Sequence, residues 1–277
     1  MAGRASRCAP PTAGRGTVPP VSSSQCASPP RSGILRNRYW ILRHGRSIPN
    51  EKGVVVSSLE NGVRPENGLA PVGIEQAKEA GKKFIKELKE EGLGEADWAN
   101  KVHIVSSPFS RTLDTSTAVM QVFPVKVKFE VIPELRERYF GPAMELQSAD
   151  KWYPVVWQVD RADYCRGPEG GESVVDVAIR MAGVVARLEK ELKGCAILLV
   201  SHGDPLQIIQ AACKPFKDTQ LQSSGRKQDG SSRPQLFDGL LNCINQNGQV
   251  GLSCEMGKSL ARHRDWPLET AELRRLL

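Results

Sequence analysis

The stretch Trp40-Ile-Leu-Arg-His-Gly-Arg46 decides the fold. Three apolar residues end abruptly on a cation, an imidazole and a glycine, which is typical of a buried strand that ends at the edge of a sheet. Ligands in open α/β sheets bind at the carboxyl ends of the strands. His44 is therefore the candidate catalytic residue, and Arg43 and Arg46 beside it are candidates for binding an anion.

The length and charge of the chain narrow its class. Its 277 residues suffice for one large domain or two small ones with a buried core. The net charge is +7, but residues 1–38 contain six arginines and neither Asp nor Glu. Without these arginines the net charge is +1, so we expect no nucleic-acid partner. No apolar run has the length of a membrane span, so we expect no membrane partner either.

Residues 1–38 are rich in Ala, Ser, Pro, Gly and Arg, a composition typical of a disordered leader or an organellar transit peptide. The alternative is a solvated tail without a targeting role. With a transit peptide the mature chain starts near Arg38 and resides in a chloroplast or mitochondrion; otherwise we expect a cytoplasmic protein. The catalytic domain is predicted to occupy residues 39–277.

The seven cysteines are scattered, odd in number and without a CxxC pair. This spacing disfavours a disulfide framework and a zinc site, and it favours a reducing compartment. Cys195 opens an apolar run and is expected in the core.

Hydrophobic periodicity predicts a regular alternation of strands and helices. Apolar or alternating runs predict strands at residues 39–43, 101–106, 125–132 and 196–200. Amphipathic patterns predict helices at residues 71–92 and 172–193, a helix that starts with Ser107 as N-cap and Pro108, and a helix from Asp204 to about Cys213. The fold class is therefore α/β, with a mostly parallel sheet in a three-layer αβα domain.

Other segments lack such periodicity. Residues 51–70 and 133–171 are predicted to be loop and irregular structure. A flexible polar stretch is expected at about 214–249, followed by a strand near 249–254 and a polar C-terminal segment.

The predicted chemistry comes from a second strand that ends in a histidine, His202, followed by Gly203. Two strand-terminal histidines, with Arg43 and Arg111 near the same edge, form a cationic pocket that suits a dianionic phosphate. A neutral imidazole can attack phosphorus, and a neighbouring imidazolium can stabilise the phosphoryl oxygens. No cluster of metal ligands is apparent, so we expect neither a metal nor a cofactor, and the arginines would stabilise the charge.

The sequence resembles the histidine phosphatase superfamily, which includes the cofactor-dependent phosphoglycerate mutases. The resemblance runs in order from about residue 39 to 213. It rests on Arg43-His44-Gly45 with Ser47 and Asn50, on LAPVGIEQA (69–77), SSPFSRTLDT (106–115), LRERYFG (135–141), GGES (170–173) and VSHG (200–203). Residues 260–276 are also similar to plant phosphoglycerate mutase-like proteins. The resemblance implies the phosphoglycerate mutase-like version of the αβα fold.

The resemblance also implies roles for individual residues. His44 would be the nucleophile and form a phosphohistidine. Glu137 would protonate the leaving oxygen and then activate water or an acceptor hydroxyl, with Glu134 as the alternative acid. The transferring phosphate would be held by Arg43, Arg111 and His202, with assistance from Asn50 and Ser47.

Two departures from the family pattern leave interpretations open. Arg46 either contacts a second anionic group or faces solvent. Asp204 either caps a helix or raises the pKa of His202.

Three functions fit these residues. The first is a metal-independent phosphomonoester hydrolase that acts on a small phosphorylated metabolite, and the second is a phosphoglycerate-type mutase that uses the same phosphohistidine. The third is a non-catalytic phospholigand-binding protein. We favour the phosphatase because a mutase needs specific lid contacts that the loop at 142–170 does not reveal. Nothing in the sequence indicates the oligomeric state.

Overall fold

The computed structural model describes residues 35–223 and 254–276. Most of the predicted leader, residues 249–253 of the strand predicted near 249–254 and most of the polar stretch lie outside these residues, whereas Cys254 begins a helix (Cys254–Ala261). The described part begins before the predicted boundary, since Asn37 is buried and its side chain donates a hydrogen bond to Glu189 Oε1 (2.8 Å).

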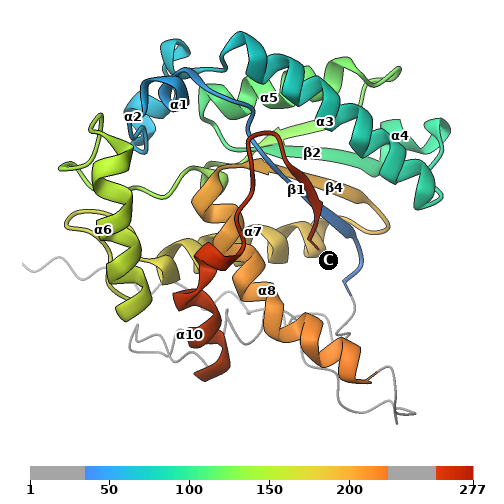
Figure 1. The fold of residues 1–277 in the computed structure, drawn as a ribbon. Coiled ribbons are helices and arrows are strands. Elements are labelled where there is room, and N and C mark those ends of the chain that lie inside the picture. The colour runs from blue at the N-terminus through green and yellow to red at the C-terminus, as the bar shows by residue number, and fades with distance from the viewer. Residues whose placement is uncertain (1–34, 224–253, 277) are drawn as a thin grey trace, which may run out of the picture. The chain divides into compact units, whose positions relative to one another are not determined.

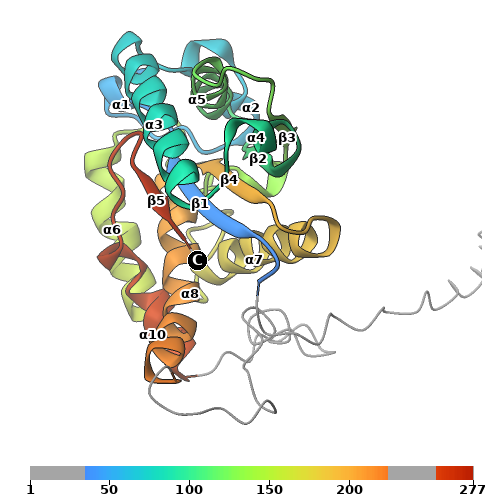
Figure 2. The same ribbon diagram turned by 90° about the vertical axis from the view of Figure 1, so that its right-hand side faces the viewer.

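A five-stranded sheet in the order β3-β2-β4-β1-β5 forms the centre of the molecule (Figure 1). Its strands are β1 (Arg38–Arg43), β2 (Val102–Ser106), β3 (Lys128–Val131), β4 (Ala196–Ser201) and β5 (Leu273–Arg275). The first four run parallel, and β5 pairs with β1 in the antiparallel direction at the edge (Figure 2). The predicted mostly parallel sheet is thus confirmed, whereas β5 was not predicted.

Helices cover both faces of the sheet, which gives the three predicted layers (Figure 1). One layer contains α3 (Pro71–Glu90), α4 (Glu95–Lys101) and α5 (Ser110–Gln121); the other contains α7 (Val174–Glu191), α8 (Gly203–Ser223) and α10 (Cys254–Ala261). Trp40 and Leu42 pack in the first core, and Tyr39 and Ile41 pack in the second. β1 is therefore buried on both faces, as its continuous apolar run predicts. Cys195 is buried, as predicted.

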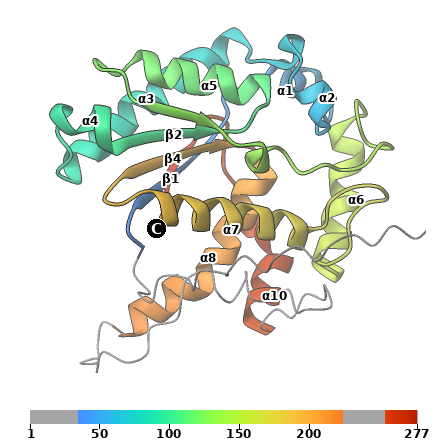
Figure 3. The same cartoon turned by 180° about the vertical axis from the view of Figure 1, so that it is seen from behind.

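The segments expected to be irregular contain short and long helices. Residues 48–70 form α1 (Ile48–Lys52), α2 (Leu59–Gly62) and η1 (Pro65–Asn67), and residues 133–171 contain η2 (Pro133–Leu135) and the 14-residue α6 (Ala149–Ala162). The prediction missed α6 because Pro154 lies inside this helix, and an internal proline is typical of irregular structure. Seen from behind, α6 stands beside the end of the sheet, beyond one end of α7 (Figure 3).

Two predicted helix boundaries were wrong. The helix after β2 begins at Ser110 with Phe109 before it, and Ser107 does not cap it. The hydroxyl of Ser107 instead contacts the ring of His202. α8 continues to Ser223 rather than ending near Cys213.

Candidate active site

Three parallel strands end at the same level and bring the two histidines together. The backbone N–H of His44 donates to the Ser201 carbonyl, and the N–H of Ser107 donates to the Val200 carbonyl, both at 3.0 Å. The rings of His44 and His202 consequently lie with centroids 5.2 Å apart. The prediction that both strand-terminal histidines share one edge is confirmed.

Gly45 is required by a close backbone approach. A Cβ atom at this position would lie 2.3 Å from the carbonyl oxygen of Gly73, in the first turn of α3. The Gly45 N–H also donates to Thr115 Oγ1 of α5 (3.1 Å). The turn after His44 is therefore fixed against two helices.

A cavity of about 260 Å³ opens at this edge of the sheet. The predicted site residues that line it are Arg43, His44, Ser47, Asn50, Arg111 and Glu137. Its volume lies just below the range of about 300–1,000 Å³ that drug-sized ligands occupy, so it suits a small metabolite.

The hydrogen bonds of His44 define its reactive nitrogen. Nδ1 lies 2.7 Å from the Gly45 carbonyl oxygen, which can only accept, so Nδ1 carries the proton. Nε2 then presents its lone pair, and it accepts a hydrogen bond from Arg111 Nε (3.2 Å). Burial, followed by the charges of Arg111 and Arg43, lowers the pKa of His44 well below its usual value. His44 is therefore neutral at physiological pH, as a nucleophile must be.

Three buried nitrogens at this edge of the sheet have no hydrogen-bond partner among the described residues. Arg43 Nε and Arg111 Nη1 belong to residues that line the cavity, whereas His202, which carries the third at Nδ1, is fully buried and does not itself line it. The other ends of both arginines are anchored. Arg43 Nη1 donates to the Leu268 carbonyl (2.6 Å), and Arg111 Nη2 donates to the Val56 carbonyl (3.0 Å). Buried polar groups almost always have partners. Donors left open in this way are ready for the oxygens of an anion.

His202 is oriented by Ser107. The Ser107 hydroxyl accepts from the Phe109 N–H (3.3 Å) and lies 2.8 Å from His202 Nε2. With the hydroxyl donating to Nε2, the proton of a neutral His202 resides on Nδ1. The pKa of His202 is lowered well below its usual value by burial and by the charge of Arg111. Nδ1–H is thus a neutral donor to an anion.

Glu137 stands between Arg111 and His202. Its Oε2 lies 3.9 Å from both Arg111 Nη2 and His202 Nδ1, and its Oε1 accepts from the Arg138 N–H (2.9 Å). Burial raises the pKa of Glu137 to about 7, against the lowering effect of Arg111. A carboxyl with this pKa can both donate and accept a proton near neutrality. The alternative acid, Glu134, is exposed and does not line the cavity.

Ser47 and Asn50 line the cavity but are also bonded to each other. The Asn50 N–H donates to Ser47 Oγ (3.3 Å) and the Ser47 backbone N–H donates to Asn50 Oδ1 (3.1 Å), which forms a capping box at α1. Their predicted part in phosphate binding stays a prediction. Arg46 is exposed, lies 3.7 Å from Glu51 and does not line the cavity, so it faces solvent.

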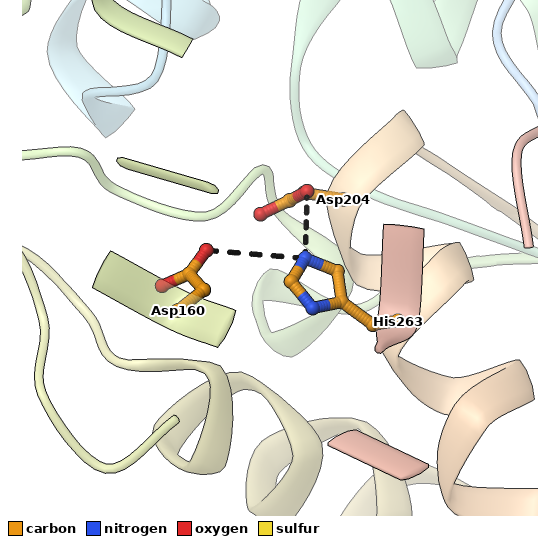
Figure 4. A group of neighbouring side chains, drawn as sticks. All are labelled: Asp160, Asp204 and His263. Carbon is orange, nitrogen blue, oxygen red and sulfur yellow. Dashed lines mark ion pairs between the residues drawn. The ribbon is translucent and has the colours of Figure 1, made fainter. Parts of the chain in front are cut away.

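A buried ion-pair network adjoins Glu137 and was not predicted. The Arg138 guanidinium donates to both oxygens of Asp160 (2.6 and 2.7 Å) and to Asp204 Oδ2 (3.1 Å). Figure 4 shows the ring of His263 facing the same two carboxylates, with Nε2 at 3.5 Å from Asp204 Oδ1 and 3.9 Å from Asp160 Oδ2. The network ties α6, α8 and η3 (His263–Asp265) to the residue next to Glu137.

The interpretation of Asp204 as a helix cap was wrong. It lies inside the first turn of α8, and its oxygens bind Arg138 and the Arg264 Nη1 (3.2 Å) rather than the helix backbone. The pKa of His202 is lowered overall, chiefly by burial and by the charge of Arg111, and the effect of Asp204 on it stays a prediction. Although burial opposes ionisation, His263 and the two arginines hold the pKa of Asp204 well below its usual range.

Asp160, Asp204 and His263 could each offer one ligand atom to a metal ion, since these atoms lie within 4.8 Å of one another. The sequence did not reveal this group because its members come from three separate segments. However, Arg138 binds both carboxylates with short hydrogen bonds, and its charge competes with a cation. The group therefore fits a buried ion-pair network better than a metal centre.

The far wall of the cavity is built from residues that the sequence analysis did not select. The rings of Tyr153 and Trp157 in α6 are stacked, with their centroids 5.5 Å apart. Gln207 of α8 and Arg264 of η3 complete this wall. The aromatic content of residues 152–157 was a usable signal, but their helix was not predicted. No signal in the sequence placed Arg264 at the cavity.

Comparison with known proteins agrees with this geometry. The sequence profile of the histidine phosphatase superfamily (branch 1) matches residues 39–228, more than half of the chain. The chain belongs to this superfamily. The resemblance noted in the sequence and the fold expected from it are thus confirmed. No described helix is long and apolar enough to cross a bilayer.

Relatives within the histidine phosphatase superfamily include phosphatases. A metal-independent phosphoserine phosphatase of Arabidopsis thaliana is 26% identical over 69% of this chain and 72% of its own length. A fructose-2,6-bisphosphatase of Saccharomyces cerevisiae is 26% identical over 62% of this chain, but the match covers only 33% of that protein. Among solved structures, the product of a Mycobacterium tuberculosis open reading frame shares the fold, with a TM-score of 0.51 and 22% identity over 86% of this chain and 89% of that one.

The superfamily match does not reach the C-terminal part of the cavity. It ends at residue 228, whereas His263, Arg264 and Leu268 lie beyond it. His44 and the three residues with open donors, Arg43, Arg111 and His202, fall inside the match. Of the far wall, Tyr153, Trp157 and Gln207 lie inside the match and Arg264 lies outside it.

Proposed function

We propose that the protein is a metal-independent phosphomonoester hydrolase that acts through a phosphohistidine on a small phosphorylated metabolite. The convergence of three open buried donors on a neutral His44 carries this proposal. Phosphatase relatives in the same superfamily support it.

In the first step, His44 Nε2 attacks phosphorus, the P–N bond forms and the P–O bond to the leaving group breaks. Glu137 gives its proton to the leaving oxygen, because a pKa near 7 keeps a large fraction of this carboxyl protonated at neutral pH. Arg43, Arg111 and His202 Nδ1 donate to the phosphoryl oxygens and stabilise their charge.

In the second step, a water molecule attacks phosphorus and the P–N bond breaks. The Glu137 carboxylate takes the proton of that water, which returns both residues to their starting states. Inorganic phosphate then leaves. A mutase would use the same first step and return the phosphoryl group to an acceptor hydroxyl.

The test is a panel of small phosphomonoesters at neutral pH, assayed with and without a chelator, for wild type and His44→Ala. We expect release of inorganic phosphate that the chelator does not change and that the variant lacks. Transfer to an added acceptor without phosphate release would favour the mutase. The absence of both activities would favour a phospholigand-binding protein, and activity in His44→Ala would contradict the mechanism.

A further inference from the structure

Arg264 presents a second guanidinium to the cavity, on the wall away from the superfamily centre. Its Cζ lies 3.9 Å from the ring centroid of Trp157, and its Nη1 donates to Asp204 Oδ1 (3.2 Å). The side chain is 30% exposed and makes no other hydrogen bond to the described residues. The stacking holds the plane of the guanidinium while most of its N–H donors stay open to a ligand.

Gln207 contributes an open acceptor to the same cavity. It is 3% exposed, it lines the cavity, and its Oε1 has no hydrogen-bond partner among the described residues. A buried amide oxygen in this state calls for an O–H or N–H donor on a ligand.

Asp204 does not cancel the charge of Arg264. Its Oδ2 accepts a hydrogen bond from Arg138 Nη1 (3.1 Å) and its Oδ1 accepts one from Arg264 Nη1 (3.2 Å), so two guanidinium groups share this carboxylate. Arg264 lines the cavity with a side chain that is 30% exposed, and its guanidinium therefore remains available to an anion.

We propose that Arg264 and Gln207 form a subsite for the leaving group of the substrate. Arg264 binds a carboxylate, for which its planar fork is suited, and Gln207 accepts a hydrogen bond from a hydroxyl or ammonium group. The substrate class is then a phosphomonoester of a small hydroxy acid or amino acid. This inference rests on the proposed phosphatase function and narrows its substrate.

The test compares kcat/KM for three esters that differ by one group each: O-phosphoserine, O-phosphoethanolamine without the carboxylate, and 3-phosphooxypropanoate without the amine. A charge-assisted contact to the carboxylate is expected to favour O-phosphoserine over O-phosphoethanolamine by about 10- to 150-fold. Arg264→Met should reduce this ratio to near 1, and Arg264→Lys should restore part of it. Gln207→Leu should instead reduce the preference for O-phosphoserine over 3-phosphooxypropanoate.

Arg262→Met is the matched control. Arg262 is two residues away, its side chain is 72% exposed and paired with Asp265, and it does not line the cavity. The control should keep the wild-type ratios. Hydrolysis of all three esters at similar kcat/KM by wild type would overturn the subsite and leave the phosphatase intact. An unchanged ratio in Arg264→Met would also overturn it. Failure of the wild type to hydrolyse any phosphomonoester would instead overturn the proposed phosphatase function.

Discussion

The two sides of the cavity differ in how they are built. On the phosphate side, His44 and His202 follow strands at the centre of the sheet, and Arg111 lies in the first turn of the helix after β2. On the leaving-group side, Tyr153, Gln207 and Arg264 come from α6, α8 and η3, held together by the buried network around Arg138. The sheet thus fixes the atoms that react, and the helices outside it fix the atoms that select.

The largest effect is expected from removing the proton donor on the phosphate side. Glu137→Gln keeps the shape but cannot protonate a leaving oxygen, so kcat/KM for alkyl phosphates should fall by roughly 10²- to 10⁴-fold. An aryl phosphate needs little protonation of its leaving group, and its rate of enzyme phosphorylation should fall much less. Single-turnover kinetics with both esters measure this difference. Equal losses for the two esters would show that Glu137 is not the acid.

The leaving-group side should depend most on Arg138. Arg138→Met leaves Asp160 and Asp204 without their main buried partner, and we expect a loss of about 3–5 kcal/mol in the free energy of unfolding. Urea denaturation followed by circular dichroism measures it. The control is Arg136→Met, which removes a partly exposed pair with Glu172 and should cost less than about 1 kcal/mol. Similar losses in both variants would contradict the importance of the buried network.

Stability should also report the raised pKa of Glu137. The pKa of Glu137 is about 7 in the folded protein and 4.5 ordinarily. The stability that its protonated form contributes is therefore fully present below pH 4.5 and is lost as the pH rises through 7. Relative to Glu137→Gln, wild type should lose about 3 kcal/mol of unfolding free energy between about pH 4.5 and about pH 8. Urea midpoints of both proteins at several pH values test this. Urea midpoints that change with pH in the same way in both proteins would show that the pKa of Glu137 is not raised.

The smallest effect is expected at Ser107. Ser107→Ala removes the hydrogen bond that orients His202, and one such bond contributes about 0.5–1.5 kcal/mol, or about 2- to 13-fold in kcat/KM. Ser116→Ala is the control, since this buried hydroxyl has no partner among the described residues and lies away from the cavity. An equal effect of both substitutions on kcat/KM would remove Ser107 from the site.

The same contrast explains what the sequence could predict. His44 and His202 end runs of apolar residues, and parallel strands that are neighbours in a sheet must end near one another. Periodicity and capping signals therefore predicted the four parallel strands, the helices α3, α5, α7 and α8, and the nearness of the histidines, but not β5. The choice of Glu137 over Glu134 came from the superfamily pattern, and the structure places only Glu137 at the cavity.

The leaving-group side could not be read in this way. α6 contains Pro154 in its interior, and a proline at such a position argues against a helix when only the sequence is known. Arg264 reaches the cavity only because α10 packs beside α8 and the following residues turn back to β5 next to β1. A charged residue such as Asp204 is partnered by side chains far away in the sequence, and local patterns carry no information about them.

The most direct test of the account is the fate of the phosphoryl group on His44. Wild-type protein mixed with a phosphorus-labelled phosphomonoester and quenched in alkali within one turnover should carry acid-labile label on the peptide that contains His44. Glu137→Gln should accumulate more of this label when an aryl phosphate is used, because its second step lacks a base. Turnover without label on His44, or label on another residue, would contradict the central claim.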